Sequence, residues 1–430
     1  MPLAGETVEV VVERVVPGGD GLARVDGAVV LIRGGLPSDQ LEVRLAKDGP
    51  RLFRGTLLRV VRPSPQRRPE AEVCPRAVAG ACGGCDWPAA TLSAHRDLKT
   101  SVVRDALGRV GKVADHELPP FGWIGSPRSY RLRNRLHVDS LGRVGFFAPR
   151  SNDVDRLETC EIVSEALLER LPAVSAVFTS AGRGGELETL EGIDGSPLVA
   201  RFRPGLPIAD PDGLARALHG PLDGIEILGP VGETVARRGP GHVDLQVGAA
   251  RFRVSAASFF QGNRFLLLPF LGEARRMLGS APVAGGRAVD LYAGGGFLTR
   301  PLLEVGFRTT AVEIDRWSGD DLQANLSAWA LEGLERGTAV RSSAEEFALR
   351  ERPGAEVVVV DPPRAGISPE VRQALLRLRP RRLLLVSCDP ATFARDVGEL
   401  RSAWRIRQVT LLDLFPGTHH VESMALLEQE

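Results

Sequence analysis

The last third of the chain contains four runs of apolar residues, and a helical segment follows each of them. The runs lie in RAVDLYAGGG, RTTAVEID, AEVVVVDPP and RRLLLVSCDP. Strands that are apolar on both faces are typical of parallel sheets covered by helices on each side. The sequence therefore predicts a parallel, Rossmann-like α/β sheet here, and such sheets bind ligands beyond the carboxyl ends of their strands.

The first part of the chain has a different pattern. Short β-branched runs between residues 6 and 61 are separated by the turns PGGDG, GGLPSD and KDGP. About five strands in so short a segment predict a small closed barrel of the OB type, a common nucleic-acid binder. A Pro- and Arg-rich linker, VRPSPQRRPE, follows this segment.

The middle of the chain is predicted to be a mixed, largely antiparallel α+β region. The Gly-rich patch at 180–188 is expected to form a hairpin loop. A helix near 92–110 could pack on the C-terminal α/β domain. The expected domains are a barrel at 1–65, a central domain with clustered cysteines at 70–255 and the α/β domain at 256–430.

Composition excludes several classes of protein. In 430 residues, 43% are hydrophobic and 25% are charged, which excludes wholesale disorder. No apolar run approaches the ~20 residues that span a bilayer, so no membrane association is expected. The N-terminal stretch carries acidic residues where a targeting peptide would be basic. Five cysteines are too few for a disulfide scaffold, so we expect a cytoplasmic protein.

The net charge is zero, with 54 basic and 54 acidic residues, but residues 121–150 hold six arginines against one acidic residue, Asp139. Codon usage could explain the arginines. A guanidinium also grips phosphate and stacks on bases, so both interpretations stay open for this stretch. The candidate RNA-binding residues are Arg128, Arg131, Arg133 and Arg135.

The strand ends carry the candidate catalytic chemistry. The loop after the first apolar run, VDLYAGGG, lets the backbone approach a nucleoside ligand, although dinucleotide-binding folds share it. Glu313 ends the next strand, where a carboxylate could accept hydrogen bonds from ribose hydroxyls; the alternative is a surface turn. Asp361 precedes a rigid double proline. Cys388 ends the fourth run, where we favour a nucleophile over an inert core thiol.

The C-terminal segment adds an acid among apolar residues, Glu422, which is unexpected unless it has a function. A metal site formed by His419, His420 and Glu422 is disfavoured, because adjacent residues of an extended segment point to opposite faces.

Six motifs occur in the order found in the RNA uridine-5-methyltransferase family, which the chain resembles over essentially its whole length. They are FFQGN (259–263), DLYAGGG (290–296), VEID (312–315), DPPRAG (361–366), SCDPATFARD (387–396) and FPGTHHVE (415–422). The predicted N-terminal barrel is similar to the TRAM domain of that family.

The resemblance implies a covalent methylation of uridine that makes 5-methyluridine. Cys388 would add to C6 of a uracil, so that C5 can take the methyl group of S-adenosylmethionine. Glu422 would then remove the C5 proton as general base. The residues implied to contact S-adenosylmethionine are Gln261, Tyr292, Glu313 and Asp361. The base must leave its stack, and Phe259 or Phe260 could pack near it.

Several residues depart from the pattern of the family. Gly262 stands where an apolar residue is usual, and Asp389 where asparagine is usual. Ala293 replaces a common cysteine, Phe297 follows the Gly loop where some relatives place a polar residue, and Ser343 stands where an acidic residue usually meets the adenine side. The nucleophile, the base and the ribose carboxylate are intact.

Four cysteines are candidates for one four-thiolate site, namely Cys74, Cys82, Cys85 and Cys160. Such a site can hold zinc or an iron–sulfur cluster. Relatives with this cluster hold a four-iron four-sulfur centre, although their first gap is usually shorter, so we prefer iron–sulfur with zinc as the alternative. Four unliganded cysteines remain a third possibility. Radical S-adenosylmethionine chemistry is disfavoured, because it needs an iron left open by only three cysteines.

We therefore expect a methyltransferase acting on structured RNA, and the resemblance favours 23S ribosomal RNA over the T-loop of transfer RNA.

 The alternative enzyme class is a nicotinamide-dependent oxidoreductase using the same Gly loop, which leaves Cys388, Glu422 and the double-proline turn unexplained. A third interpretation is an RNA-binding protein whose catalytic domain has decayed. We expect a monomer.

Overall fold

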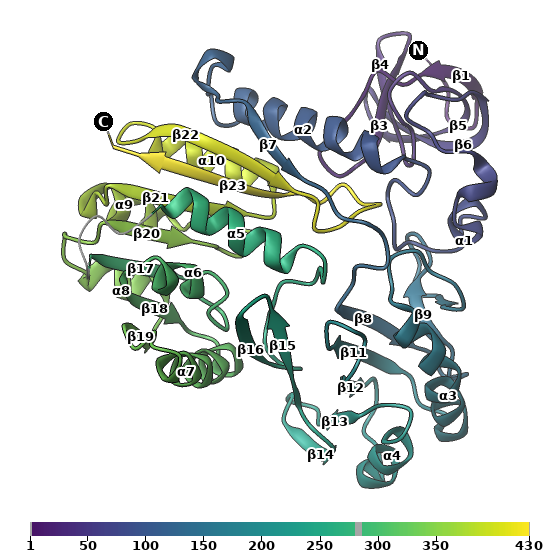
Figure 1. The fold of residues 1–430 in the computed structure, drawn as a ribbon. Helices are drawn as coiled ribbons and strands as arrows, with labels where there is room; N and C mark the ends of the chain where they lie inside the picture. Colours follow the sequence, from purple (N-terminus) through teal and green to yellow (C-terminus); the bar gives the residue numbers. More distant parts are fainter. Residues whose placement is uncertain (1, 280–285, 430) are drawn as a thin grey trace.

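The computed structural model describes residues 2–279 and 286–429, and this part of the chain contains sheets of six, seven and eight strands and a two-stranded hairpin (Figure 1). Within these ranges, no helix is long and apolar enough to cross a membrane.

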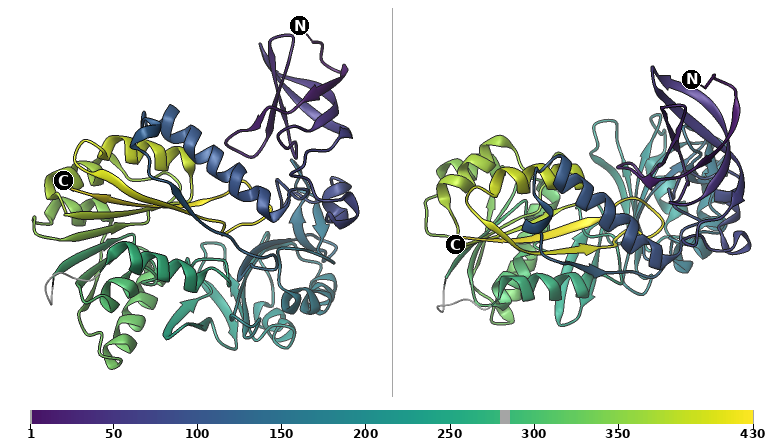
Figure 2. Two further views of the ribbon diagram at one scale, coloured as in Figure 1. Left: turned by 45° about the horizontal axis from the view of Figure 1, so that its top comes forward. Right: turned by 90° about the horizontal axis from the view of Figure 1, so that it is seen from above.

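The six-stranded sheet forms the N-terminal barrel, in the order β1-β5-β6-β4-β3-β2. Its strands are β1 (Thr7–Val11), β2 (Arg14–Val15), β3 (Gly21–Val25), β4 (Ala28–Ile32), β5 (Gln40–Gly49) and β6 (Leu52–Arg62). Alternate residues of β5, namely Leu41, Val43 and Leu45, are buried, as expected for strands with one face toward a core. The barrel stands beside α2 (Leu92–Arg109) and away from the other sheets (Figure 2).

The seven-stranded sheet forms the central region, in the order β10-β9-β8-β11-β12-β13-β14. Its strands are β8 (Arg133–Val138), β9 (Val144–Phe147), β10 (Val154–Arg156), β11 (Gly185–Glu191), β12 (Leu198–Pro204), β13 (Gly224–Leu228) and β14 (Thr234–Arg238). Its helices are α3 (Glu165–Ala181) and α4 (Pro211–Leu218). The prediction of a hairpin loop at 180–188 is wrong, because this segment joins the end of α3 to β11. Gly182, with a positive φ of 59°, ends the helix.

The eight-stranded sheet forms the catalytic region, in the order β19-β18-β17-β20-β21-β23-β22-β7. Its strands are β7 (Phe121–Ile124), β17 (Arg287–Leu291), β18 (Arg308–Glu313), β19 (Gly337–Arg341), β20 (Val357–Val360), β21 (Arg382–Ser387), β22 (Arg405–Leu412) and β23 (Glu422–Glu428). The strands from β17 to β21 are parallel, and β23 runs antiparallel between β21 and β22.

Both faces of this sheet are buried, which explains its continuous apolar strands. Val357 and Val359 pack into the core on one face, whereas Val358 and Val360 pack into the core on the other. The first face is covered by α5 (Leu267–Leu278), α6 (Thr299–Glu304) and α7 (Arg316–Leu331). The second is covered by α2, α8 (Ala344–Arg350), α9 (Pro369–Leu378) and α10 (Pro390–Leu400).

Segments from the middle of the chain also belong to this catalytic body. Helix α2 packs against α10, and β7 pairs in parallel with β22. The hairpin of β15 (His242–Val247) and β16 (Ala250–Ser255) packs on α7, where Ser255 N donates to Asp321 Oδ2 at 2.7 Å. Helix α2, strand β7 and this hairpin therefore pack with the catalytic region although they precede residue 256 in the chain. The short helices are α1 (Pro75–Val78) and the 3-10 turns Glu70–Glu72 and Asp115–Glu117.

Candidate active site

The carboxyl ends of the parallel strands meet where the strand order reverses. From β17 the chain proceeds outward through β18 and β19, and it then returns to add β20 and β21 on the other side. The loops after β17 and β20 therefore part at this point, which is where open α/β sheets bind ligands.

The loop after β17 is shaped by residues with positive φ. Tyr292, Gly294 and Gly296 have φ values of 63°, 56° and 91°. Gly294 N donates to Glu313 Oε2 at 2.8 Å, so the acid that ends β18 lies directly against the Gly loop. Tyr292 Oη donates to Glu345 Oε1 at 3.2 Å. A Cβ on Gly294 would meet nothing within 4 Å, which leaves the loop open to a ligand.

Asp361, Cys388 and Glu422 converge on the same edge. Asp361 follows β20 and Cys388 follows β21, and these strands are neighbours in the sheet. Glu422 begins β23, whose Ser423 pairs with Ser387 of β21. Three segments that are separate in sequence thus bring two carboxyl groups and a thiol together.

The electrostatics of the three groups are coupled. Burial, together with the charges of Glu422 and Asp361, raises the pKa of the Cys388 thiol to about 12, while Arg364 opposes this rise. Burial also raises the pKa of Asp361 to about 7, and burial and Asp361 together raise that of Glu422. Glu422 is 4% exposed. Each of these groups therefore holds its proton more tightly than it would in water, as expected for acids held together away from water.

The segment FFQGN lies beside this edge. Phe260 is buried in the core, whereas Phe259 is 68% exposed, so only Phe259 is free to contact a base from solution. Gln261 is buried. Asn263 fixes the segment, because its Nδ2 donates to Leu414 O at 2.9 Å.

Three of the departures from the family pattern, at Phe297, Ser343 and Asp389, have local explanations. A Cβ at Gly262 would meet nothing within 4 Å, so no neighbour requires a glycine there. Phe297 packs edge-on against Phe270 in the core. Ser343 caps α8 by accepting from Glu346 N at 3.1 Å, and Asp389 caps α10 by accepting from Thr392 N at 2.8 Å. Both caps stabilise helices that begin at the site edge.

One buried acid was not singled out by the motifs. Asp290 lies near the end of β17, and its Oδ2 accepts a hydrogen bond from Thr299 Oγ1 at 2.5 Å. Burial, together with the charges of Asp361 and Glu313, raises its pKa to about 7. Its place just before the Gly loop in VDLYAGGG is the sequence signal that could have identified it.

The four clustered cysteines line one cavity, together with Phe146 and Ile162. Burial raises the pKa of Cys85 to about 12, and the neighbouring thiols Cys160, Cys82 and Cys74 contribute. Within residues 2–279 and 286–429, however, no group of three or more His, Cys, Asp or Glu side chains is placed to hold a metal ion. The fold therefore brings the four cysteines to the walls of one cavity.

The four candidate arginines of the basic stretch make different kinds of contact. Arg133 Nη2 donates to Ala256 O at 3.0 Å, and its guanidinium also donates to Ser258 O. Arg131 lies over the ring of Phe146, 5.5 Å from its centroid. These two guanidinium groups are committed to internal partners, because β8 begins between the central and catalytic regions.

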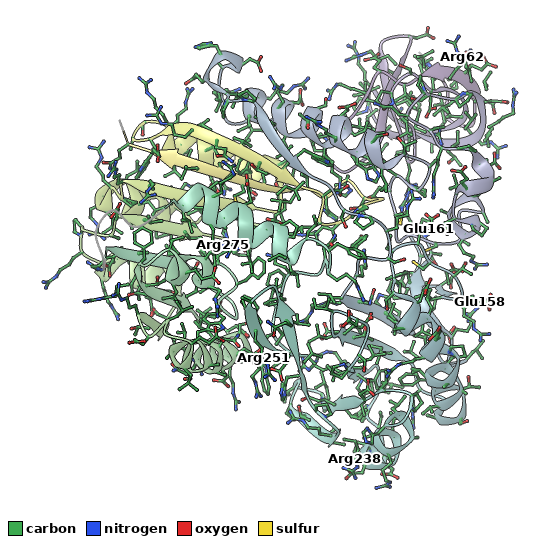
Figure 3. The ribbon with its side chains drawn as sticks, in the orientation of Figure 1. Arg62, Glu158, Glu161, Arg238, Arg251 and Arg275 are labelled. Carbon is green, nitrogen blue, oxygen red and sulfur yellow. The ribbon has the colours of Figure 1, made fainter. Side chains whose placement is uncertain are left out.

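The other two arginines lie nearer the surface. Arg128 Nε is 3.6 Å from Glu161, which is labelled in Figure 3. Arg135 is exposed and pairs with Glu188 at 3.0 Å. Acidic partners thus offset the local positive charge of both residues.

Comparisons with known proteins agree with this architecture. Residues 242–430 match the family described as tRNA (uracil-5-)-methyltransferase, and residues 3–58 match the TRAM domain. The chain is 30% identical to an RNA methyltransferase of Aquifex aeolicus, with 98% of each chain covered. It is 31% identical to the 23S rRNA (uracil(1939)-C(5))-methyltransferase RlmD of Edwardsiella ictaluri, with 95% of this chain and 93% of the relative covered.

A solved structure has the same fold over nearly the whole length. It is the tRNA (uracil-54, C5)-methyltransferase of Pyrococcus abyssi, with a TM-score of 0.75, 22% identity, and coverage of 97% of this chain and 99% of that one. Membership of a methyltransferase family leaves no support for the nicotinamide-dependent alternative. The chain belongs to the RNA (uracil-5-)-methyltransferase family, a family of S-adenosylmethionine-dependent enzymes, and carries an N-terminal TRAM domain.

Proposed function

We propose that this enzyme makes 5-methyluridine in 23S ribosomal RNA through a covalent adduct between Cys388 and C6 of the target uracil. The convergence of Cys388, Glu422 and Asp361 on one sheet edge is the observation that carries the mechanism. The ribosomal substrate is supported by the 31% identity to the Edwardsiella ictaluri enzyme, whose name specifies 23S rRNA.

The reaction needs a nucleophile because C5 of uracil is weakly nucleophilic. S-adenosylmethionine supplies the methyl group when bound. The Cys388 thiolate would form the S–C6 bond, and the electron pair displaced to C5 would form the new C5–methyl bond, with S-adenosylhomocysteine as the leaving group. The Glu422 carboxylate then takes the C5 proton, the C5–C6 double bond re-forms, and the S–C6 bond breaks to release the thiolate.

The cofactor is proposed to lie along the Gly loop. Glu313 is placed to accept hydrogen bonds from the ribose hydroxyls, and its carboxylate is already oriented by Gly294 N at 2.8 Å. Tyr292, Gln261 and Asp361 complete the proposed contacts. A bound sulfonium cation near Cys388 would lower the pKa of the thiol, because an opposite charge favours the ionised form.

The test is methyl transfer from labelled S-adenosylmethionine to ribosomal RNA and transfer RNA that lack their own 5-methyluridine. Label should appear as 5-methyluridine in 23S ribosomal RNA and disappear with Cys388→Ala. Label in transfer RNA alone would move the substrate to the T-loop. No transfer to either RNA, with RNA binding retained, would favour the decayed RNA-binding protein.

We also propose that Cys74, Cys82, Cys85 and Cys160 hold a four-iron four-sulfur cluster, with zinc as the alternative. Four thiols on the walls of one cavity are a donor set that fits either group. Iron, sulfide and zinc would be counted in protein purified without oxygen, beside a Cys82→Ser variant. Zinc without sulfide would refute the cluster, and a metal-free protein would refute both.

RNA binding is proposed to start at the TRAM barrel, and Arg128 and Arg135 remain candidate contacts. Cytoplasmic location and a monomeric state stay predictions.

A further inference from the structure

The loop between β22 and β23, residues 413–421, is held against the cysteine-bearing segment by contacts that the proposed mechanism does not use. Figure 1 shows this loop in yellow, reaching from the catalytic sheet toward the N-terminal segments. Gly417 O accepts hydrogen bonds from two consecutive amides, Asp86 N at 3.0 Å and Trp87 N at 2.9 Å. A Cβ on Gly417 would lie 3.5 Å from Cys85 Sγ, so the loop touches the cysteine itself.

A side-chain pair reinforces this contact three residues before the proposed base. Asp86 Oδ2 lies 2.6 Å from His419 Nδ1 and accepts from His419 N at 3.2 Å. One carboxylate oxygen thus holds both the ring and the backbone of His419. Glu422 follows closely along the chain and begins β23.

The barrel limits movement of the cysteine-bearing segment from the other side. Trp87 Nε1 donates to Gly19 O at 2.7 Å, and Arg33 Nη2 donates to Cys85 O at 3.1 Å. A Cβ on Gly19 would lie only 2.9 Å from His419 Cβ. The cysteine-bearing segment is therefore held between the barrel and the loop that leads to Glu422.

We propose that Asp86 is a positioning residue that acts through His419 to hold Glu422 in line with the C5 proton. This inference rests on the proposed role of Glu422 as general base. Residues 413–421 lie outside the β22–β23 ladder, so their position depends on contacts such as this pair. A misplacement of about 1 Å can cost roughly 10²-fold in rate.

The test measures the step that Glu422 performs. Large-subunit ribosomal RNA is transcribed with uridine or with 5-deuterouridine, and kcat and KM are measured for wild type, Asp86→Ala, His419→Ala and the double variant. We expect kcat of Asp86→Ala to fall about tenfold to 10²-fold, with KM for RNA unchanged. The deuterium isotope effect on kcat should rise above that of wild type, because proton removal becomes the slowest step.

The variants separate positioning from general damage. The double variant should lose no more than Asp86→Ala, because both changes break the same link, and Asp86→Asn should restore part of the rate by keeping an acceptor for His419 N. Glu158→Ala is the matched control, since it removes an exposed acid two residues before Cys160. Glu158 is labelled in Figure 3. It should behave as wild type.

An RNA with 5-fluorouridine provides the second readout. The fluorine cannot leave as the C5 proton does, so the covalent adduct accumulates before the base acts. Asp86→Ala should form this adduct at the wild-type rate. A slower adduct with an unchanged isotope effect, or a His419→Ala variant with wild-type kinetics, would overturn the positioning role. Wild type that forms neither adduct nor 5-methyluridine would refute the proposed function instead, and the positioning role with it.

Discussion

Replacing Lys99 by methionine should destabilise the junction between α2 and the loop 413–421 in a pH-dependent way. Lys99 is 0% exposed, and its Nζ donates to Asp413 Oδ1 at 2.5 Å, to His420 O at 2.6 Å and to Phe415 O at 3.2 Å. Methionine keeps the packing of the side chain but removes the positive charge of the ammonium group. It leaves Asp413 buried without that cation.

The loss of stability depends on how the variant neutralises the buried carboxylate of Asp413. Asp413 can take up a proton, which at pH 7.5 costs about 5 kcal/mol, since this pH lies ~3.6 units above the ordinary pKa of Asp. His95 Nδ1 lies 3.1 Å from Asp413 Oδ2 and could take the proton instead, for about 1.4 kcal/mol before its burial is counted. Burial lowers the pKa of His95, so we expect roughly 3–5 kcal/mol.

The pH dependence has the same sign for either proton acceptor. In wild type, burial alone would raise the pKa of Asp413, but the Lys99 charge outweighs it and the pKa is lowered overall. The stability that Asp413 contributes is therefore present above the ordinary pKa of ~3.9 and is lost as the pH falls through the lower pKa of the folded state. The folded variant holds one proton more. The loss of stability should therefore shrink by about 1.4 kcal/mol for each pH unit between pH 7.5 and 5.

Native-state hydrogen exchange of amides in α2 and β22–β23 is the suitable assay, because a chain of several domains need not unfold in one step. A Lys99→Met/Asp413→Asn variant should recover much of the loss and show no such slope. A Lys99→Met loss that is independent of pH, or below about 1 kcal/mol at pH 7.5, would refute this account.

Three further predictions concern the site and its supports. Alkylation of Cys388 by iodoacetamide in the free protein should be slow at pH 7.5 and accelerate through pH 10, because its pKa is raised to about 12; a plateau near pH 8 would contradict this. Gly19→Ala should lower stability by roughly 1–3 kcal/mol in thermal unfolding, since its φ is 88° and the new Cβ meets His419; an unchanged melting temperature would refute the contact. Glu313→Gln should weaken binding of S-adenosylhomocysteine about tenfold by calorimetry, because an amide accepts fewer hydrogen bonds from ribose and from Gly294 N; equal affinity would remove Glu313 from the proposed site.

The sequence identified the catalytic edge because consecutive strand ends of a parallel sheet must meet there. Continuous apolar runs revealed β17, β18, β20 and β21, and Glu313, Asp361 and Cys388 follow from their positions at the ends of these strands. The sequence pattern distinguishes Glu422 only as an acid among apolar residues. Its approach to Cys388 depends on β23 inserting antiparallel between β21 and β22.

Local patterns could not reveal the contacts made between distant segments. A basic stretch looks the same in sequence whether its guanidinium groups face solvent or, like those of Arg131 and Arg133, find partners inside the protein. Asp86 and His419 are 333 residues apart, and no periodicity relates them.

Strand and helix signals arise from backbone period and burial within a few neighbouring residues, so the chain itself determines the α/β sheet and the residues at its edge. The partners of Lys99, Asp86 and Arg133 were decided only when the barrel, the central sheet and the catalytic sheet packed together. Packing between remote segments selects these contacts, because a buried charge must find its counterpart wherever the fold brings one within reach.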